Sequence, residues 1–159
     1  MSVTVKDNVL SVVADELDAL RERIIANHEA AGQVASGRTR DSIRVERTED
    51  GGKLWGRQAF GVLETGRKPG KVPKGFYHII RQWVDDKGIR VPNPDSFAYL
   101  VARKIATEGT EMYRSGQKKD IYSTDTQKAI REIERKVLGI FDTEVEHINL
   151  NFKNEDSRI

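Results

Sequence analysis

Two glycines and a run of cations in the stretch 61-GVLETGRKPGKVPKG-75 raise the question of phosphate chemistry. Gly61 and Gly66 have the five-residue spacing of a P-loop, whose backbone cradles nucleotide phosphates. Such a loop continues with Lys and Ser or Thr and enters a helix at once, because its N–H groups and the helix terminus must converge on phosphate. Here Gly66 is followed by Arg67, Lys68 and Pro69, with no magnesium-binding hydroxyl and no helix start. The segment therefore does not fit a nucleotide site.

The remaining residues with chemical potential do not form a recognisable catalytic or metal-binding pattern. His28, His78 and His147 fall on or near the apolar faces of three different predicted helices, and no two have the spacing of a metal-binding helix. The acid pairs Asp15-Glu16 and Asp85-Asp86 are adjacent in sequence, so their side chains point in different directions on a helix. The sequence also has no Gly-x-Ser-x-Gly motif. We therefore expect no enzymatic activity, no metal and no cofactor.

Composition sets further limits on the kind of protein. The 159 residues include no cysteine, which excludes disulfides, thiolate metal sites and cysteine nucleophiles. No window approaches about eighteen consecutive apolar residues, so no membrane span is expected. The first ten residues lack the basic-then-apolar layout of a signal peptide. Hydrophobic residues make up 37% of the chain and charged residues 33%, which indicates a folded protein with much solvated or partner-facing surface.

The small net charge of +2 conceals a basic middle. Residues 37–90 carry thirteen Lys and Arg against seven Asp and Glu, whereas residues 1–36 carry three against six. Either these loops are simply charged, or they meet a polyanion or an acidic neighbour. Aromatic residues do not alternate with the basic ones, and sequence-specific nucleic-acid readout has no support. Non-specific contact with DNA stays open. The candidate contact residues are Arg38, Arg40, Arg44, Arg67, Lys68, Lys71 and Lys74.

Periodicity predicts the elements that must position these residues. Apolar residues recur at three- and four-residue steps over 6–31, which indicates an amphipathic helix. Alternation over 42–47, a turn at 49–52 and a β-compatible run over 53–63 predict a hairpin. Two shorter helices are expected over about 76–87 and from Pro94 to near Gly109, with Asn93 as the N-cap of the second.

The C-terminal part predicts a loop, a long helix and a strand. Residues 110–124 are polar and are expected to form a mobile loop. A helix follows over about 125–147, and alternating Ile148, Leu150 and Phe152 predict a strand that adds to a sheet. The expected fold is therefore α+β, with a small antiparallel sheet (the hairpin plus the added C-terminal strand) packed against long N- and C-terminal helices and two central helices. We expect one domain over residues 1–152 and a polar tail over 153–159.

The order of the motifs resembles one protein family. A helix leads into "ASGRTRDSI", and the hairpin ends in "AFGVLETGRKPG". The short helix "FYHIIRQWVDDKGI" and then "FAYLVARKIATEGT" follow. Over about residues 35–112 this is similar to the tail-completion (head–tail joining, minor tail) family of tailed bacteriophages. The matching residues are Ser36-Gly37, Ser42-Ile43, Val62 to Gly66, Trp83 to Gly88 and Ala102 to Thr110.

The resemblance implies a virion structural protein that forms a homo-oligomeric ring at the neck, between the portal-bearing head and the tail. Its partners would be the portal or an adaptor and tail proteins, with non-specific contact to packaged double-stranded DNA, no membrane, and residence in the host cytoplasm before assembly. Loops 36–40, 66–74 and 110–124 would make the subunit and lumen contacts, and the C-terminal strand is a second candidate contact. The polar-loop candidates are Tyr113, Arg114, Lys118 and Lys119. Two alternatives stay open: a solvated connection at 66–74, and a stand-alone nucleic-acid-binding module.

Overall fold

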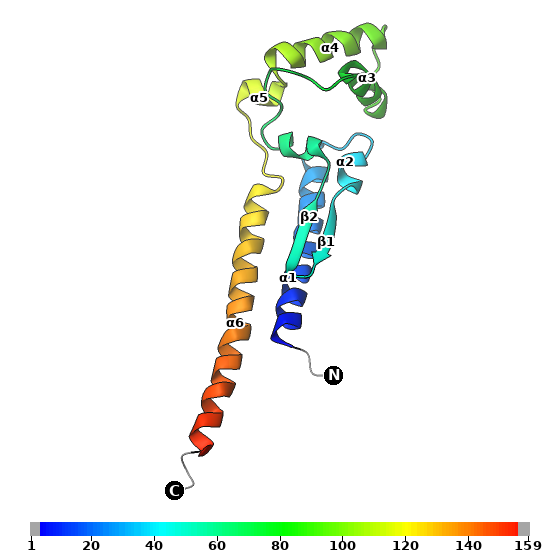
Figure 1. Ribbon diagram of the computed structural model, residues 1–159. Helices are drawn as coiled ribbons and strands as arrows, with labels where there is room; N and C mark the ends of the chain where they lie inside the picture. The colour runs from blue at the N-terminus through cyan, green and yellow to red at the C-terminus, as the bar shows by residue number, and fades with distance from the viewer. Residues whose placement is uncertain (1–3, 156–159) are drawn as a thin grey trace. The chain divides into compact units, whose positions relative to one another are not determined.

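The computed structural model describes residues 4–155 and shows a helix-rich α+β protein with one two-stranded antiparallel sheet (Figure 1). The chain forms two compact units. Unit 1 contains the residues up to Arg23, the segment Arg44–Trp55 and the chain from Ser123 onward. Unit 2 contains Ile24–Ile43 and Gly56–Tyr122. The α+β class expected from the sequence is thus confirmed.

Helix α1 (Val5–Ala30) confirms the amphipathic pattern of its sequence and contributes residues to both units. It begins at a reciprocal cap: the Asp7 N–H donates to Thr4 Oγ1 at 3.1 Å, and the Thr4 N–H donates to the Asp7 carboxylate at 3.1 Å. Such a cap satisfies N–H groups that have no partner within the helix. In unit 1 the buried α1 residues include Ala14 and Leu20.

The hairpin consists of β1 (Arg44–Thr48) and β2 (Gly51–Trp55), joined at Glu49 and Asp50. The second strand was expected to continue to residue 63, and this was wrong: a 3₁₀ helix, η1 (Gln58–Val62), follows instead. The physical reason is that Trp55 pairs with Arg44, the first residue of β1, so later residues have no strand to pair with. The hairpin lies against α1, where a Cβ on Gly52 would come within 2.5 Å of Leu17 Cδ1.

Helix α6 (Ser123–Glu155) runs antiparallel to α1 within unit 1 (Figure 1). Arg23 Nε lies 3.5 Å from the Asp125 carboxylate, and Lys136 Nζ donates to the buried Glu16 carboxylate at 2.5 Å. From Glu16 to Arg23 the residue number rises along α1, whereas the partner on α6 falls from Lys136 to Asp125. The two helices are therefore antiparallel. Over residues 4–155 none of the helices, α6 included, has both the length and the apolar character needed to cross a bilayer.

The predicted C-terminal strand is wrong, because residues 148–152 lie inside α6. Ile148, Leu150 and Phe152 alternate, but Phe141, Val145, Ile148 and Phe152 also recur at steps of four, three and four, which is helical spacing. Extending an existing helix requires no new nucleation. A sequence that fits both the two-residue period of a strand and the 3.6-residue period of a helix therefore continues as helix. Of the expected polar tail 153–159, residues 153–155 extend α6 and the rest lie outside the described residues.

Unit 2 is built around two packed helices, α3 (Phe76–Asp86) and α4 (Pro94–Glu108). Their core contains two β-branched residues of α3, Ile80 and Val84, and two alanines of α4, Ala98 and Ala102. The predicted start of α4 is confirmed, since the Asn93 side chain accepts a hydrogen bond from the Ser96 N–H at 2.9 Å. A single turn, α2 (Arg38–Asp41), precedes the hairpin.

Two lysines donate hydrogen bonds to the backbone carbonyls that follow α1 in unit 2. Lys87 Nζ donates to the carbonyls of Gly32 and Val34, each at 2.9 Å. Lys119 Nζ donates to the Ala31 carbonyl at 2.6 Å. These carbonyls follow the last residue of α1, so the two ammonium groups also lie near the negative end of its helix dipole, where positive charge is favourable.

His28 is the most deeply buried titratable residue of this region, with 2% of its surface exposed, and its Nδ1 has no hydrogen-bond partner. Burial lowers the pKa of His28, and the positive charge of Arg40 lowers it further, against an opposing effect of Glu29. The folded protein therefore binds fewer protons at this site than the unfolded chain.

We expect the free energy of unfolding to fall as the pH drops from 7 to 5, below the ordinary histidine pKa of about 6.5, because only the unfolded chain is then easily protonated at His28. One such group contributes at most about 1.4 kcal/mol per pH unit. Urea unfolding of the wild type and of His28→Gln at several pH values measures this slope. The slope should be smaller in His28→Gln and unchanged in His78→Gln, which alters an exposed histidine. Equal slopes in all three proteins would contradict the prediction.

Candidate functional site

The basic loop, defined as residues 66–74, is fastened to the end of α4 rather than standing free. The Arg67 N–H donates to Thr110 Oγ1 at 2.9 Å, and the Thr110 N–H donates to the Arg67 carbonyl at 2.9 Å. Further along, the Gly70 N–H donates to the Ala106 carbonyl at 2.9 Å. Three hydrogen bonds thus fix the first five residues of the loop against α4 and the residues after it.

Two glycines make this close approach possible. Gly66 has φ 73°, and a Cβ there would lie 2.4 Å from Thr110 Oγ1. Gly109 has φ 83°, and a Cβ there would lie 2.7 Å from the Arg67 carbonyl oxygen. Both positions combine a left-handed backbone with no space for a side chain, so only glycine fits them without strain. Gly66 and Gly109-Thr110 are therefore parts of one structural contact.

Arg67 serves the loop's own structure. Its guanidinium lies over the Phe76 ring, 5.6 Å from the ring centroid, and its Nη2 donates to the Lys71 carbonyl at 2.6 Å. Nε of Arg67 is buried and has no hydrogen-bond partner. A cation held over an aromatic ring and across a loop in this way stabilises the loop, and it is only partly available to an outside anion.

The three lysines of the loop are its accessible charges. Lys68, Lys71 and Lys74 are exposed, and none of them has a carboxylate partner among the residues that the structure describes. Two of them line a hollow of about 500 Å³. We call this the basic hollow; its main lining residues are Val62, Arg67, Lys68, Pro69, Lys71 and Tyr113. Its surface combines apolar side chains with cations, which suits an amphipathic partner.

The arginines of residues 38–44 differ in their surroundings. Arg38 Nη2 lies 3.3 Å from the Asp86 carboxylate. Arg40 pairs with Asp41 at 2.7 Å and Glu29 at 3.0 Å, and the hydrogen bond to Asp41 is the main reason that the pKa of Arg40 is raised. These two side chains are already engaged with carboxylates. Arg44, on β1 in unit 1, is exposed and has no ion pair within residues 4–155.

Residues 110–124 were expected to form a mobile loop, and this was wrong in part. A short helix, α5 (Glu111–Ser115), begins the segment. Arg114 pairs with Glu108 at 2.6 Å and with Glu111, and the bond to Glu108 is the main cause of its raised pKa. The Lys119 N–H donates to the Glu64 carbonyl at 2.9 Å, in addition to the contact of its ammonium with α1. Tyr113 and Lys118 remain exposed, and Tyr113 lines the basic hollow.

Glu64 anchors the far end of that segment and was missed as a key residue by the sequence reasoning. Its side chain is buried, and Oε1 accepts hydrogen bonds from the N–H groups of Ile121 at 2.9 Å and Tyr122 at 2.6 Å. A charged acceptor shared by two backbone donors is among the stronger hydrogen-bonding arrangements in proteins. An acid within an otherwise basic stretch, directly after the apolar Val62 and Leu63, was the signal that could have identified it.

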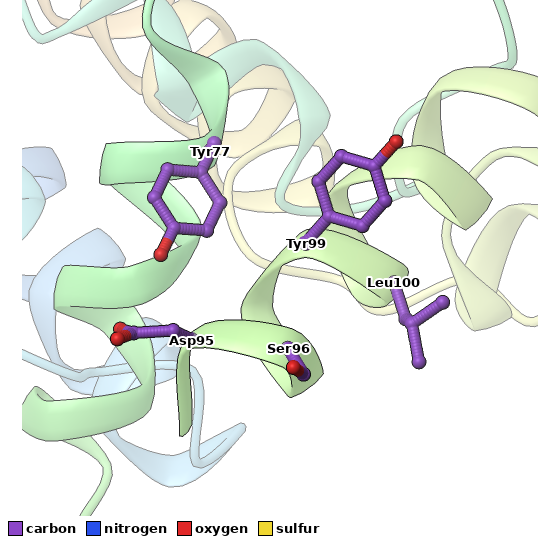
Figure 2. A pocket seen from close by; sticks show the side chains of 5 residues that line it. All are labelled: Tyr77, Asp95, Ser96, Tyr99 and Leu100. Carbon is purple, nitrogen blue, oxygen red and sulfur yellow. The ribbon is translucent and has the colours of Figure 1, made fainter. Parts of the chain in front are cut away.

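A second hollow, of about 530 Å³, lies where α3 meets the start of α4 (Figure 2). Tyr77 and Tyr99 stand on either side of it, and the Tyr77 hydroxyl points toward Asp95. Burial and the nearby charge of Asp95 raise the pKa of Tyr77. Arg81 donates to Asp95 at 2.7 Å and thereby lowers the pKa of that carboxyl group. The aspartate is held in its charged form by an arginine, so it is poorly suited to accept a proton from a substrate.

No group of three or more His, Asp or Glu side chains within the described range 4–155 is arranged to hold a metal ion. The arrangement around the basic loop offers fixed positive charge beside exposed apolar surface. Chemically, it can bind an anionic or amphipathic surface.

Replacing Glu64 with alanine should lower the free energy of unfolding by about 2–4 kcal/mol, because two backbone N–H groups would lose their acceptor in a buried place. Glu64→Gln keeps one oxygen acceptor and should cost less. Urea unfolding measures both changes, and hydrogen exchange at Ile121 and Tyr122 locates them. Glu49→Ala, at an exposed turn position, is the control and should change stability by no more than about 0.5 kcal/mol. A glutamine variant as damaged as the alanine variant would refute the role of the shared acceptor.

Comparison with known proteins gives no match: no family model, no curated protein and no solved structure is similar to this chain.

Proposed function

We propose that the chain is a virion structural protein of a tailed bacteriophage, a subunit of the neck or connector ring that joins the portal-bearing head to the tail. Its partners are copies of itself, the portal or an adaptor, and tail proteins. It acts in the virion neck after assembly in the host cytoplasm, and it has no reaction to catalyse.

The observation that carries this proposal is the amount of large apolar side chain left exposed beside fixed charge. In unit 2 the aromatic side chains Tyr99 and Tyr113 are 56% and 46% exposed, and Leu100 is 61% exposed. In unit 1 a run of apolar residues on α6 is about half exposed. Contiguous apolar surface on a protein usually marks an interaction site. A subunit surrounded by neighbours on several sides needs such surface in several places.

The residues that carry the family resemblance support the proposal in a second way. Gly66 and Gly109-Thr110 belong to two different motifs of the similar region, more than forty positions apart in sequence, yet they meet in the contact that fastens the basic loop. Glu64, between Val62 and Gly66, secures the segment after α5. These motif positions therefore fix the conformation of the basic loop and of the segment after α5. A protein that binds its neighbours through loops needs such fixed conformations.

A stop codon placed early in the gene, in the phage or prophage that carries it, tests the proposal directly. We expect separate heads and tails that do not join, because the ring between them cannot form. Electron microscopy of lysates shows this, and supplying the intact chain from a plasmid should restore joined particles. Normal, infectious particles without the chain would sink the proposal.

A second candidate, non-specific binding to double-stranded DNA, is favoured by the three loop lysines without carboxylate partners. Three phosphate contacts predict that log K falls against log salt concentration with a slope of about −3. Titration of duplex DNA at several salt concentrations measures the slope, and Lys68→Ala/Lys71→Ala/Lys74→Ala should abolish it. A slope of about −6 would mean that many more cations contact phosphate, and it would favour a stand-alone DNA-binding module over a neck subunit.

A further inference from the structure

The C-terminal half of α6 carries an exposed apolar stripe, defined as Leu138, Phe141, Val145 and Ile148. These residues are separated by steps of three, four and three, so they lie along one side of the helix. Each is between 50% and 62% exposed. A helix with such a stripe ordinarily buries it against another surface.

Helix α1 of the same unit leaves at least half of the surface of each stripe residue exposed. The contacts of Glu16 with Lys136 and of Arg23 with Asp125 place the two helices antiparallel, so the first residue of α1, Val5, lies near residue 145 of α6. Phe141 shares a hollow of about 400 Å³ with Val5 and Val9 at the start of α1 and is still half exposed. Beyond about residue 145 α6 continues past the start of α1, and all four residues of the stripe are at least half exposed.

The charges beside the stripe are all negative. Residues 137–148 contain Asp142, Glu144 and Glu146 and no lysine or arginine. With about 3.6 residues per turn, Asp142 and Glu144 fall on opposite sides of the stripe. Two copies of this stripe packed on each other would bring like charges together, which destabilises a helix pair. The stripe instead suits a surface that is apolar in its centre and positive at its edge.

The basic hollow of unit 2 has this character. Val62 and Tyr113 supply apolar surface, being 39% and 46% exposed. Lys68 and Lys71 supply positive charge that no described carboxylate neutralises. Because the Arg67 backbone is bonded to Thr110, the backbone that carries these lysines is ordered before any partner arrives, which lowers the entropic cost of binding.

We propose that the apolar stripe of α6 in one copy docks into the basic hollow of a second copy. The contact joins two different surfaces, so every copy keeps one free stripe and one free hollow, and repeated contacts close into a ring if the rotation allows. The inference deepens the proposed neck function by naming the surfaces between subunits, and it rests on that function only for the closed ring.

Charge reversal on each surface tests the contact. Asp142→Lys/Glu144→Lys makes the stripe's edges positive, and Lys68→Glu/Lys71→Glu makes the hollow negative. Each variant alone should associate at least about tenfold more weakly than the wild type, because like charges then face each other. A mixture of the two variants should regain association, and so should one chain with all four substitutions. Sedimentation velocity up to about 0.1 mM protein measures the association constants.

A matched control and a second measurement make the test decisive. Glu46→Lys/Glu49→Lys reverses two exposed charges on the hairpin and should associate like the wild type. Zero-length carbodiimide cross-linking of mixed ¹⁴N and ¹⁵N protein should join Lys68 or Lys71 of one copy to Asp142 or Glu144 of another. Circular dichroism verifies that each variant is folded.

Several outcomes would overturn the inference. These are a wild-type chain that stays monomeric at about 0.1 mM, failure of the mixture and of the four-substitution chain to recover association, or cross-links only within one copy. The association experiments and the stop-codon experiment can fail independently of each other. Copies that associate through these surfaces while particles join normally without the chain would refute the neck function alone. Unjoined particles together with unaffected charge-reversal variants would refute the contact alone.

Discussion

The exchange of hydrogen bonds between Arg67 and Thr110 is the interaction on which the accessible surface of unit 2 depends. It joins the loop after η1 to the residues after α4, and it requires that neither Gly66 nor Gly109 carry a side chain. Pro69 and Pro73 further restrict the backbone conformation of the basic loop, because the proline ring fixes φ. The first part of the basic loop therefore has a fixed backbone, from which its exposed lysine side chains extend.

The difference between formal charge and available charge is a second lesson of the structure. Residues 37–90 have a clear excess of lysine and arginine, but Arg38 and Arg40 pair with acids and Arg67 is committed to Phe76 and a carbonyl. Exposed ion pairs contribute little to stability, yet they do reduce the positive potential offered to a partner. Of the candidate contact residues, the three loop lysines and Arg44 are those without an ion pair among the described side chains.

The sequence predicted the elements whose signals are local. The period of α1 and the Asn93-Pro94 start of α4 depend on neighbouring residues only, and both were confirmed. The strand over 148–152 was wrong because alternating apolar residues also fit the helix already under way. The contacts of Glu64 with Ile121 and Tyr122 join residues 57 and 58 positions apart, and no local pattern encodes such a pair. The sequence predicted that residues 66–74 lack regular secondary structure, while the hydrogen bonds that shape this loop became visible only in three dimensions.

The hydrogen bonds of two distant lysines to the carbonyls that follow α1 have a consequence for how the chain folds during synthesis. The helix leaves the ribosome long before Lys87 and Lys119 are made, because these residues lie 55 and 88 positions beyond the carbonyls they contact. At about 5–20 residues per second, several seconds pass before these carbonyls can meet their lysine partners. The connection after the first helix therefore gains its lysine contacts only when most of unit 2 has been translated, although it is among the first parts of that unit to be made.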